Sequence, residues 1–168
     1  VAVAILHALD TYGLERVALV DFDVHHGNGS EDILAGDQRV LMCSSFESGI
    51  YPFCGDVPKA ANMVNTGLPS RSGGKAFREA VSQHWIPALD AFRPQLLFIS
   101  AGFDGHREDD MGNLGLTEAD FEWVTRELVG VANRHAKGRI VSCLEGGYEL
   151  SPLGRSAAAH VKVLIGAD

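Results

Sequence analysis

The sequence has no cluster of basic residues, no long apolar run and no paired-cysteine motif. Its 14 Lys and Arg are outnumbered by 22 Asp and Glu, which gives a formal net charge of -8. Without a basic stripe that follows phosphates, we expect no nucleic-acid partner. The longest apolar stretch near the start covers residues 1–6, far short of the roughly 20 residues that cross a bilayer. No signal-peptide pattern is present either, so we expect no membrane partner.

The three cysteines, Cys43, Cys54 and Cys143, are odd in number and lack Cys-x-x-Cys spacing. We interpret two of them as small apolar residues of buried strands, which fits a reducing cytoplasm. With 168 residues, 46% hydrophobic and 21% charged, the chain is expected to form one globular domain. The acidic balance would attract lysine-rich peptides or polyamines, although solubility alone also explains it.

A first group of polar residues follows the apolar run Val17–Val20. Because side chains alternate along a strand, Asp21, Asp23 and His25 are expected to share one face. Carboxylate oxygens and an imidazole nitrogen form a ligand set that suits a divalent metal, zinc above all. The alternative is a strand-end turn of hydrogen-bonded polar residues.

A second apolar run, Leu96–Ser100, leads to Asp104. Both runs are typical of central parallel strands that are buried on both faces. Open α/β sheets bind ligands at the carboxyl ends of such strands, so we expect Asp104 to lie beside Asp23 and His25. Three protein ligands leave a fourth position open, which is typical of catalytic zinc.

A third predicted strand, Arg139–Leu144, is followed by Glu145-Gly146-Gly147-Tyr148. Alone, this turn is explained by ordinary packing. Beside an open metal site, the phenol of Tyr148 becomes a candidate donor to a developing oxyanion.

Together, three segments resemble the histone deacetylase family, and within it the class II and bacterial branch that includes acetylpolyamine amidohydrolases. These segments are Asp21-Phe22-Asp23-Val24-His25-His26-Gly27-Asn28-Gly29, Ser100-Ala101-Gly102-Phe103-Asp104-Gly105-His106 and Leu144-Glu145-Gly146-Gly147-Tyr148. The resemblance runs from Val1 to about Gly166. It implies an α/β three-layer sandwich with a mostly parallel sheet, as in arginase. Residues 1–168 would form the C-terminal part of a single catalytic domain.

The resemblance also implies chemistry. Asp23, His25 and Asp104 would bind Zn²⁺, with Fe²⁺ as the second candidate, and Tyr148 would polarise the amide carbonyl opposite the metal. The implied reaction is hydrolysis by metal-bound water of an acetyl group on a long-stemmed primary amine. The implied partners are an acetyl-lysine peptide or an acetylpolyamine.

Further roles follow from the same resemblance. Asp21 would orient one imidazole of a catalytic histidine pair, and Asn28 would support the other. A structural K⁺ or Na⁺ would lie near the main chain of the metal-binding strand end and the next strand. The residues matched to that cation site are Asp21, Asp23, His25, Ser44 and Ser45.

Tyr51 and Met111, with Gly146 and Gly147, match the narrow tunnel that holds the acyl-lysine stem. Taken singly, Tyr51 and Met111 fit a core tyrosine and a core methionine equally well. At the tunnel entrance the chain departs from the family, because residues 47–50 read Glu-Ser-Gly-Ile where relatives often carry Gln-His-Pro.

The family's general base, a tandem histidine pair, lies in the half of the domain that precedes this chain's first residue. The only tandem pair here is His25-His26, and the metal needs its first member. His26 and His106 are near the motifs, but the resemblance gives neither the role of base. We therefore expect this chain alone to be inactive, and its unpaired sheet edge to favour self-association into homo-oligomers.

Two other functions stay open at this point. One is a non-catalytic metal- or peptide-binding module of the same fold. The other is an Asp-x-Asp phosphatase with Asp21 as nucleophile and Asp23 as acid, although that scheme has no place for His25-His26 or the Gly-Gly-Tyr turn.

Between the strands, the pattern predicts helices. Ser72 is expected to cap a helix that Pro87 kinks or ends early. Its buried face would carry Phe77, Val81, Trp85 and Leu89.

A capping box at residues 117–120 predicts a second helix that ends before Gly138. Residues 151–165 are expected to form the last helix. Residues 47–70, with three prolines, are predicted to be mostly loop.

Overall fold

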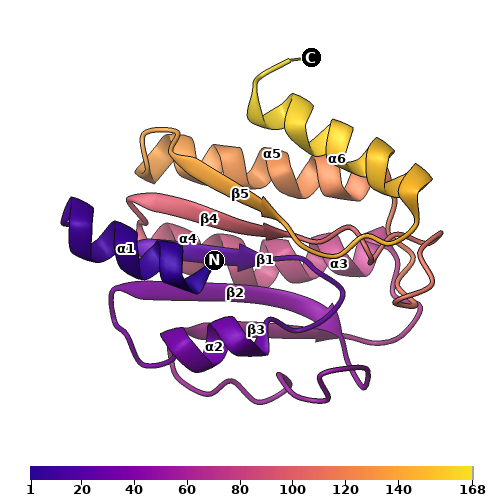
Figure 1. The fold of residues 1–168 in the computed structure, drawn as a ribbon, viewed down its shortest axis with the longest axis horizontal. Helices are drawn as coiled ribbons and strands as arrows, with labels where there is room; N and C mark the ends of the chain where they lie inside the picture. Colours follow the sequence, from indigo (N-terminus) through magenta and orange to yellow (C-terminus); the bar gives the residue numbers. More distant parts are fainter. Residues whose placement is uncertain (168) are drawn as a thin grey trace.

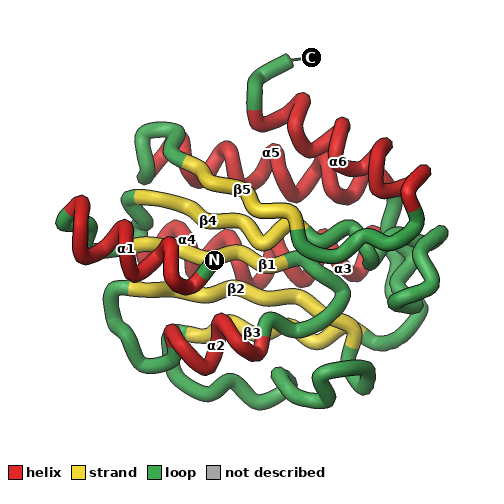
Figure 2. The backbone as a smooth tube through the Cα atoms, in the orientation of Figure 1, coloured by secondary structure: helices red, strands yellow, loops and turns green. Residues whose placement is uncertain are grey.

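A computed structural model describes residues 1–167, which form a three-layer α/β sandwich around one parallel sheet (Figures 1 and 2). The strand order is β3-β2-β1-β4-β5. The strands are β1 (Val17–Asp21), β2 (Val40–Glu47), β3 (Met63–Leu68), β4 (Leu96–Ala101) and β5 (Ile140–Leu144). The helices are α1 (Ala2–Tyr12), α2 (Asn28–Leu34), α3 (Gly74–Ala80), the π-helical turn η1 (Val81–Trp85), α4 (Ile86–Phe92), α5 (Glu118–His135) and α6 (Leu150–Leu164).

Strand β1 lies at the centre of the sheet and is buried along its whole length. Val17 and Leu19 pack with α1 on one face, and Ala18 and Val20 pack with α3, α4 and α5 on the other. Because both faces are covered, residues 17–20 of the strand are all apolar, as predicted for a central parallel strand. The polar residues begin with Asp21, the last residue of the strand, which is still buried.

The outer edge of β5 has no strand neighbour among residues 1–167. Leu144 at its end is 63% exposed, and Val141 is also exposed. This open edge agrees with the unpaired sheet edge expected from the sequence.

The sequence-based prediction missed one strand and misplaced one helix cap by a residue. β3 lies within the segment predicted to be mostly loop, and its half-exposed, polar sequence at the sheet edge gave little strand signal. The cap of α3 is Gly73 rather than Ser72. The four predicted apolar positions of this helical segment are all buried, however. Pro87 does not end the helical path. It is the second residue of α4, just after the wide turn η1, where a proline is tolerated because the regular helical hydrogen bonds are already interrupted.

The other helix predictions are confirmed. α5 begins with the predicted capping box, in which Asp120 accepts hydrogen bonds from the backbone N–H and hydroxyl of Thr117. α6 begins and ends one residue from the predicted bounds. No described helix is long and apolar enough to cross a membrane.

His160 on α6 joins three elements. Its ring nitrogens lie 2.7 Å from Thr125 Oγ1 of α5 and 2.9 Å from Ser142 Oγ of β5. Burial lowers the pKa of His160 from 6.5 to about 4. The unfolded chain therefore binds this proton more tightly than the folded chain, and stability is lost as the pH falls from about 6.5 toward 4.

Because of His160, we expect the free energy of unfolding to fall by roughly 3 kcal/mol as the pH is lowered through that range. Urea unfolding of the wild type and of His160→Gln at several pH values measures it. The variant should be less stable at neutral pH and should lose less stability on acidification. Parallel pH profiles for the two proteins would contradict the assignment.

Candidate metal centre

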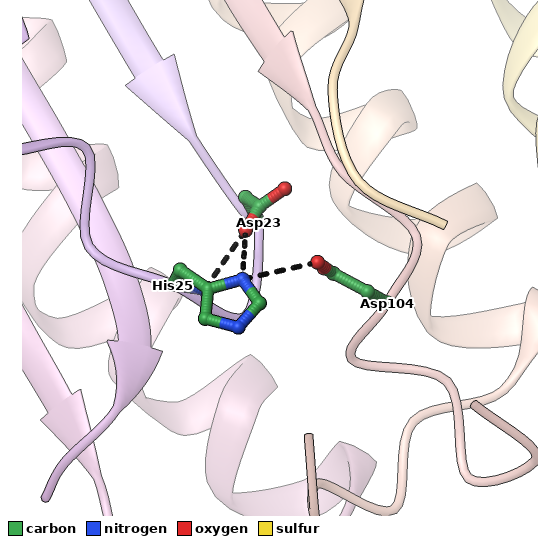
Figure 3. Close-up of side chains that lie close together, drawn as sticks. All are labelled: Asp23, His25 and Asp104. Carbon is green, nitrogen blue, oxygen red and sulfur yellow. Dashed lines mark hydrogen bonds and ion pairs between the residues drawn. The ribbon is translucent and has the colours of Figure 1, made fainter. Parts of the chain in front are cut away.

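Three side chains meet beyond the carboxyl ends of β1 and β4 (Figure 3). One ligand atom each from Asp23, His25 and Asp104 lies within 4.8 Å of the other two. His25 Nδ1 is 3.0 Å from Asp23 Oδ1 and 3.2 Å from Asp104 Oδ2. The structure thus brings together the three residues that the sequence suggested as metal ligands; their binding of a metal stays a prediction.

The parallel register of the sheet explains this meeting. Asp21 at the end of β1 pairs with Ser100 of β4, so the two following loops leave the same edge side by side. Backbone groups then fix the carboxylates. Asp104 Oδ1 accepts a 2.9 Å hydrogen bond from Val24 N, and Asp23 Oδ2 accepts a 2.8 Å bond from Gly146 N.

The second oxygen of Asp104 is the strongest sign that the cluster fits a cation. The Asp104 side chain is 0% exposed, and its Oδ2 has no hydrogen bond within the described part of the chain. Burial, and then the charge of Asp23, raise the pKa of Asp104 to about 7. Two carboxylates held this close in a buried site repel each other unless a cation neutralises them. The donor set of two oxygens and one nitrogen suits zinc.

Gly146 closes the other side of the cluster. A Cβ at this position would overlap Asp104 Oδ2 and come within 2.7 Å of Asp23 Oδ2. Gly147 adopts φ of +136°, a conformation that L side chains rarely adopt. The Gly-Gly pair therefore lets the backbone press against both carboxylates and turn toward Tyr148.

A cleft of about 510 Å³ opens over the cluster. Tyr148 lines it and is 58% exposed. Burial of part of the ring, and then the charge of Asp104, raise the pKa of Tyr148. Its phenol is thus protonated at neutral pH and able to donate a hydrogen bond. The lining residues are Asp21, Asp23, His25, His26, Gly27, Gly29, Ser30, Ser100, Leu144, Glu145, Gly146 and Tyr148.

Tyr51 and Met111 are surface residues. They are 68% and 50% exposed, which rules out the core tyrosine and core methionine that the sequence left open. The Tyr51 ring lies edge-on to the His25 ring, with centroids 6.2 Å apart. Their role as tunnel walls stays a prediction.

The residues predicted to support the histidine pair and the monovalent cation differ in their burial and contacts. Asp21 is buried at the cleft, and burial, with the charge of Asp23, raises its pKa well above the usual value. Asn28 is the first residue of α2, and its side chain makes no hydrogen bond within residues 1–167. Ser44 and Ser45 are buried in β2, with Ser44 beside Asp21. The roles of these residues with a histidine pair and a monovalent cation stay predictions.

His26 has a structural partner set. Its Nε2 lies 2.9 Å from Glu31 Oε2, and its Nδ1 lies 3.1 Å from Ser44 Oγ. Burial alone would raise the pKa of Glu31, but hydrogen bonds from His26 and Asn65 outweigh it and lower that pKa. With both ring nitrogens engaged and the side chain fully buried, His26 is poorly placed to act as a base.

Sequence reasoning missed two polar residues of the cleft, Ser100 and Glu145. Ser100 Oγ donates a 3.1 Å hydrogen bond to Glu145 Oε1, which ties the end of β4 to the turn after β5. Both residues lie at strand ends within the segments that resemble the histone deacetylase family. That position could have identified them from the sequence.

The fold and the cluster together define an open-sheet α/β protein with a candidate metal centre at its carboxyl edge. Residues 1–164 match the histone deacetylase domain, and the chain belongs to the histone deacetylase family. It is 40% identical to "Type-2 histone deacetylase 2" of Dictyostelium discoideum, over 98% of this chain and 11% of that protein. It is 37% identical to "Histone deacetylase-like amidohydrolase" of Pseudomonas aeruginosa, over 88% of this chain and 41% of that protein.

Among solved structures, the crystal structure of the HDA15 HD domain superposes with a TM-score of 0.88 at 33% identity. This match covers 99% of the chain and 49% of that structure. The arginase/deacetylase fold expected from the sequence is thus confirmed. The chain spans about half or less of the length of these relatives.

Proposed function

We propose that the protein containing this chain is a zinc-dependent amidohydrolase that removes an acetyl group from a primary amine on a long stem. The observation that carries this proposal is the cluster of Asp23, His25 and Asp104, with a buried carboxylate oxygen that lacks a hydrogen bond. It lies at the base of a cleft that Tyr148 lines. We propose residues 1–168 as the C-terminal part of its catalytic domain.

Asp23, His25 and Asp104 would hold the ion, Zn²⁺ or, as the second candidate, Fe²⁺. When bound, such an ion supplies a Lewis acid that polarises an amide carbonyl and makes water a better nucleophile at neutral pH. The buried carboxylates supply the negative charge that retains it. Ser44, Ser45 and the strand end at Asp21 are the proposed place of a structural K⁺ or Na⁺.

Tyr148 would act on the substrate directly. Its raised pKa keeps the phenol protonated, so the hydroxyl donates to the carbonyl oxygen as negative charge develops there. The Gly146-Gly147 backbone sets the path of this residue beside the cluster. Asp21 and Asn28 would support the imidazoles of the base pair expected outside this chain.

For the substrate, we propose acetyl-lysine in a peptide or an acetylpolyamine. Tyr51 exposes an aromatic ring beside His25, and Met111 exposes a thioether on the loop that carries Asp104; both side chains suit an aliphatic stem. The net charge of -8 favours cationic partners. The Pseudomonas aeruginosa relative is named an amidohydrolase, which agrees with this reaction class.

We expect the chain of residues 1–168 alone to lack efficient deacetylase activity. Of the two described histidines that line the cleft, His25 is a proposed metal ligand and His26 has both ring nitrogens engaged, so neither is free to take a proton. Hydrolysis of an acetyl-lysine peptide by the purified chain with zinc, beside the complete protein, measures this. Equal turnover by the two would show that a residue of this chain, such as His106, serves as base.

A phosphatase is a weaker candidate. Its nucleophile would be Asp21, which is buried, has a raised pKa and accepts a hydrogen bond from Asp23 N. A buried carboxyl whose charged form is disfavoured by its surroundings is a poor nucleophile. A non-catalytic metal-binding module remains the alternative, and zinc-dependent hydrolysis of an acetylated amine separates it from an enzyme.

A further inference from the structure

Two loops, one with the proposed metal ligand Asp104 and the other with Tyr148, are joined to each other. The first, the Asp104 loop (residues 102–113), follows β4; the second, the tyrosine loop (residues 145–149), follows β5. Their backbones meet where Phe103 N donates a 2.8 Å hydrogen bond to Gly146 O. At the surface, Arg155 of α6 reaches across to Glu108 with a 2.9 Å ion pair.

Asp109 is the third and most buried of these connections. Asp109 is only 5% exposed. Asp109 Oδ2 accepts hydrogen bonds from Tyr148 N at 2.7 Å and Glu149 N at 3.1 Å, and Oδ1 accepts from Met111 N at 3.0 Å. One carboxylate thus binds backbone N–H groups of both loops.

The chemistry of these three donors requires a carboxylate. All three contacts come from backbone N–H groups, and an ionised carboxylate accepts on both oxygens. Glu149 is also the residue before α6, so the negative charge lies at the N-terminus of a 15-residue helix. An asparagine has only one acceptor oxygen, so its NH₂ group would face a backbone N–H donor and one side of the contact would be lost. The lost contact would be either that to Met111 N or those to the tyrosine loop.

We propose that Asp109 is a positioning residue, which fixes the backbone of Tyr148 relative to Met111 and so aims the phenol at the substrate carbonyl. This inference rests on the proposed amidohydrolase function. Asp109 does not touch the reacting atoms. It acts through Tyr148, whose side chain, 58% exposed, receives little packing support of its own.

The test compares Asp109→Asn and Asp109→Glu with wild type in the complete protein. Misplacing a catalytic group by about 1 Å costs on the order of 10²-fold, so kcat should fall roughly 10- to 100-fold while zinc content stays unchanged. Asp110→Asn is the matched control, because Asp110 is exposed, carries the same charge and has no hydrogen-bond partner among the described residues. It should keep wild-type kcat.

A double-mutant cycle separates positioning from a general structural role. In a Tyr148→Phe background, Asp109→Asn should lower kcat by less than about threefold, since interacting residues are not additive. Equal fold losses in both backgrounds would overturn the proposal, as would a wild-type kcat in Asp109→Asn.

Amide hydrogen exchange gives a readout that does not depend on activity. Peptides covering residues 145–150 should exchange at least about tenfold faster in Asp109→Asn than in wild type, with unchanged exchange in β1. Unchanged exchange of residues 145–150 would refute the proposal that Asp109 fixes the tyrosine loop. Absence of amide hydrolysis by the wild type, together with faster exchange in the variant, would instead refute the proposed function. The result would still support the role of Asp109 in fixing the tyrosine loop.

Discussion

Tyr148→Phe should lower kcat of the complete protein on an acetylated amine by about 10²–10³-fold, the usual cost of losing one oxyanion donor. The substitution removes only the hydroxyl and keeps the ring that lines the cleft. Zinc content should stay the same, because Tyr148 is not one of the three clustered ligands. Steady-state kinetics with metal analysis of the same samples measures both.

Tyr12→Phe is the matched control for this result. Tyr12 is exposed at the end of α1, contacts the His7 ring and is absent from the cleft lining. It should leave kcat unchanged. Full activity of Tyr148→Phe would mean that the phenol is not the oxyanion donor.

Asp104→Asn should stabilise the metal-free protein but remove the stabilisation that bound metal gives. The amide keeps an oxygen for the hydrogen bond from Val24 N but removes one of two close buried charges. The pKa of Asp104 is raised from 3.8 to about 7, so the folded protein binds this proton more tightly than the unfolded chain. The carboxyl therefore destabilises the metal-free fold increasingly as the pH rises from about 4 to 7.

At pH 8, metal-free Asp104→Asn should accordingly melt at a higher temperature than metal-free wild type. Zinc should raise the melting temperature of wild type and not that of the variant, because ligands stabilise only what they bind. Asp110→Asn, an exposed charge change on the same loop, should behave as wild type. Equal zinc-induced shifts in Asp104→Asn and wild type would remove Asp104 from the metal site.

The sequence was most informative where apolar runs end in polar residues. The buried strands β1 and β4 each begin with four apolar residues and become polar only near their ends, and parallel strands direct their carboxyl ends to one edge. Asp23, His25 and Asp104 could therefore be placed together, although Asp104 lies 79 positions after His25.

The sequence was least informative where tertiary contacts decide the structure. β3 forms by pairing with β2 and has little apolar pattern of its own. Asp109 stands in the run Glu108-Asp109-Asp110, whose three acidic residues look alike in sequence. Only the fold shows that Asp109 alone is buried against the backbone of the tyrosine loop. Contacts between distant backbone groups leave no local sequence signal.

The most direct test of a zinc-dependent amidohydrolase is a metal titration of the complete protein. Metal-free protein would be titrated with Zn²⁺ while acetate release from an acetyl-lysine peptide and from an acetylpolyamine is followed. We predict no release without metal, and a rise that saturates at about one equivalent, as expected for a single three-ligand site. Undiminished hydrolysis by the metal-free protein, or no hydrolysis of either substrate at saturating Zn²⁺, would contradict the proposed function.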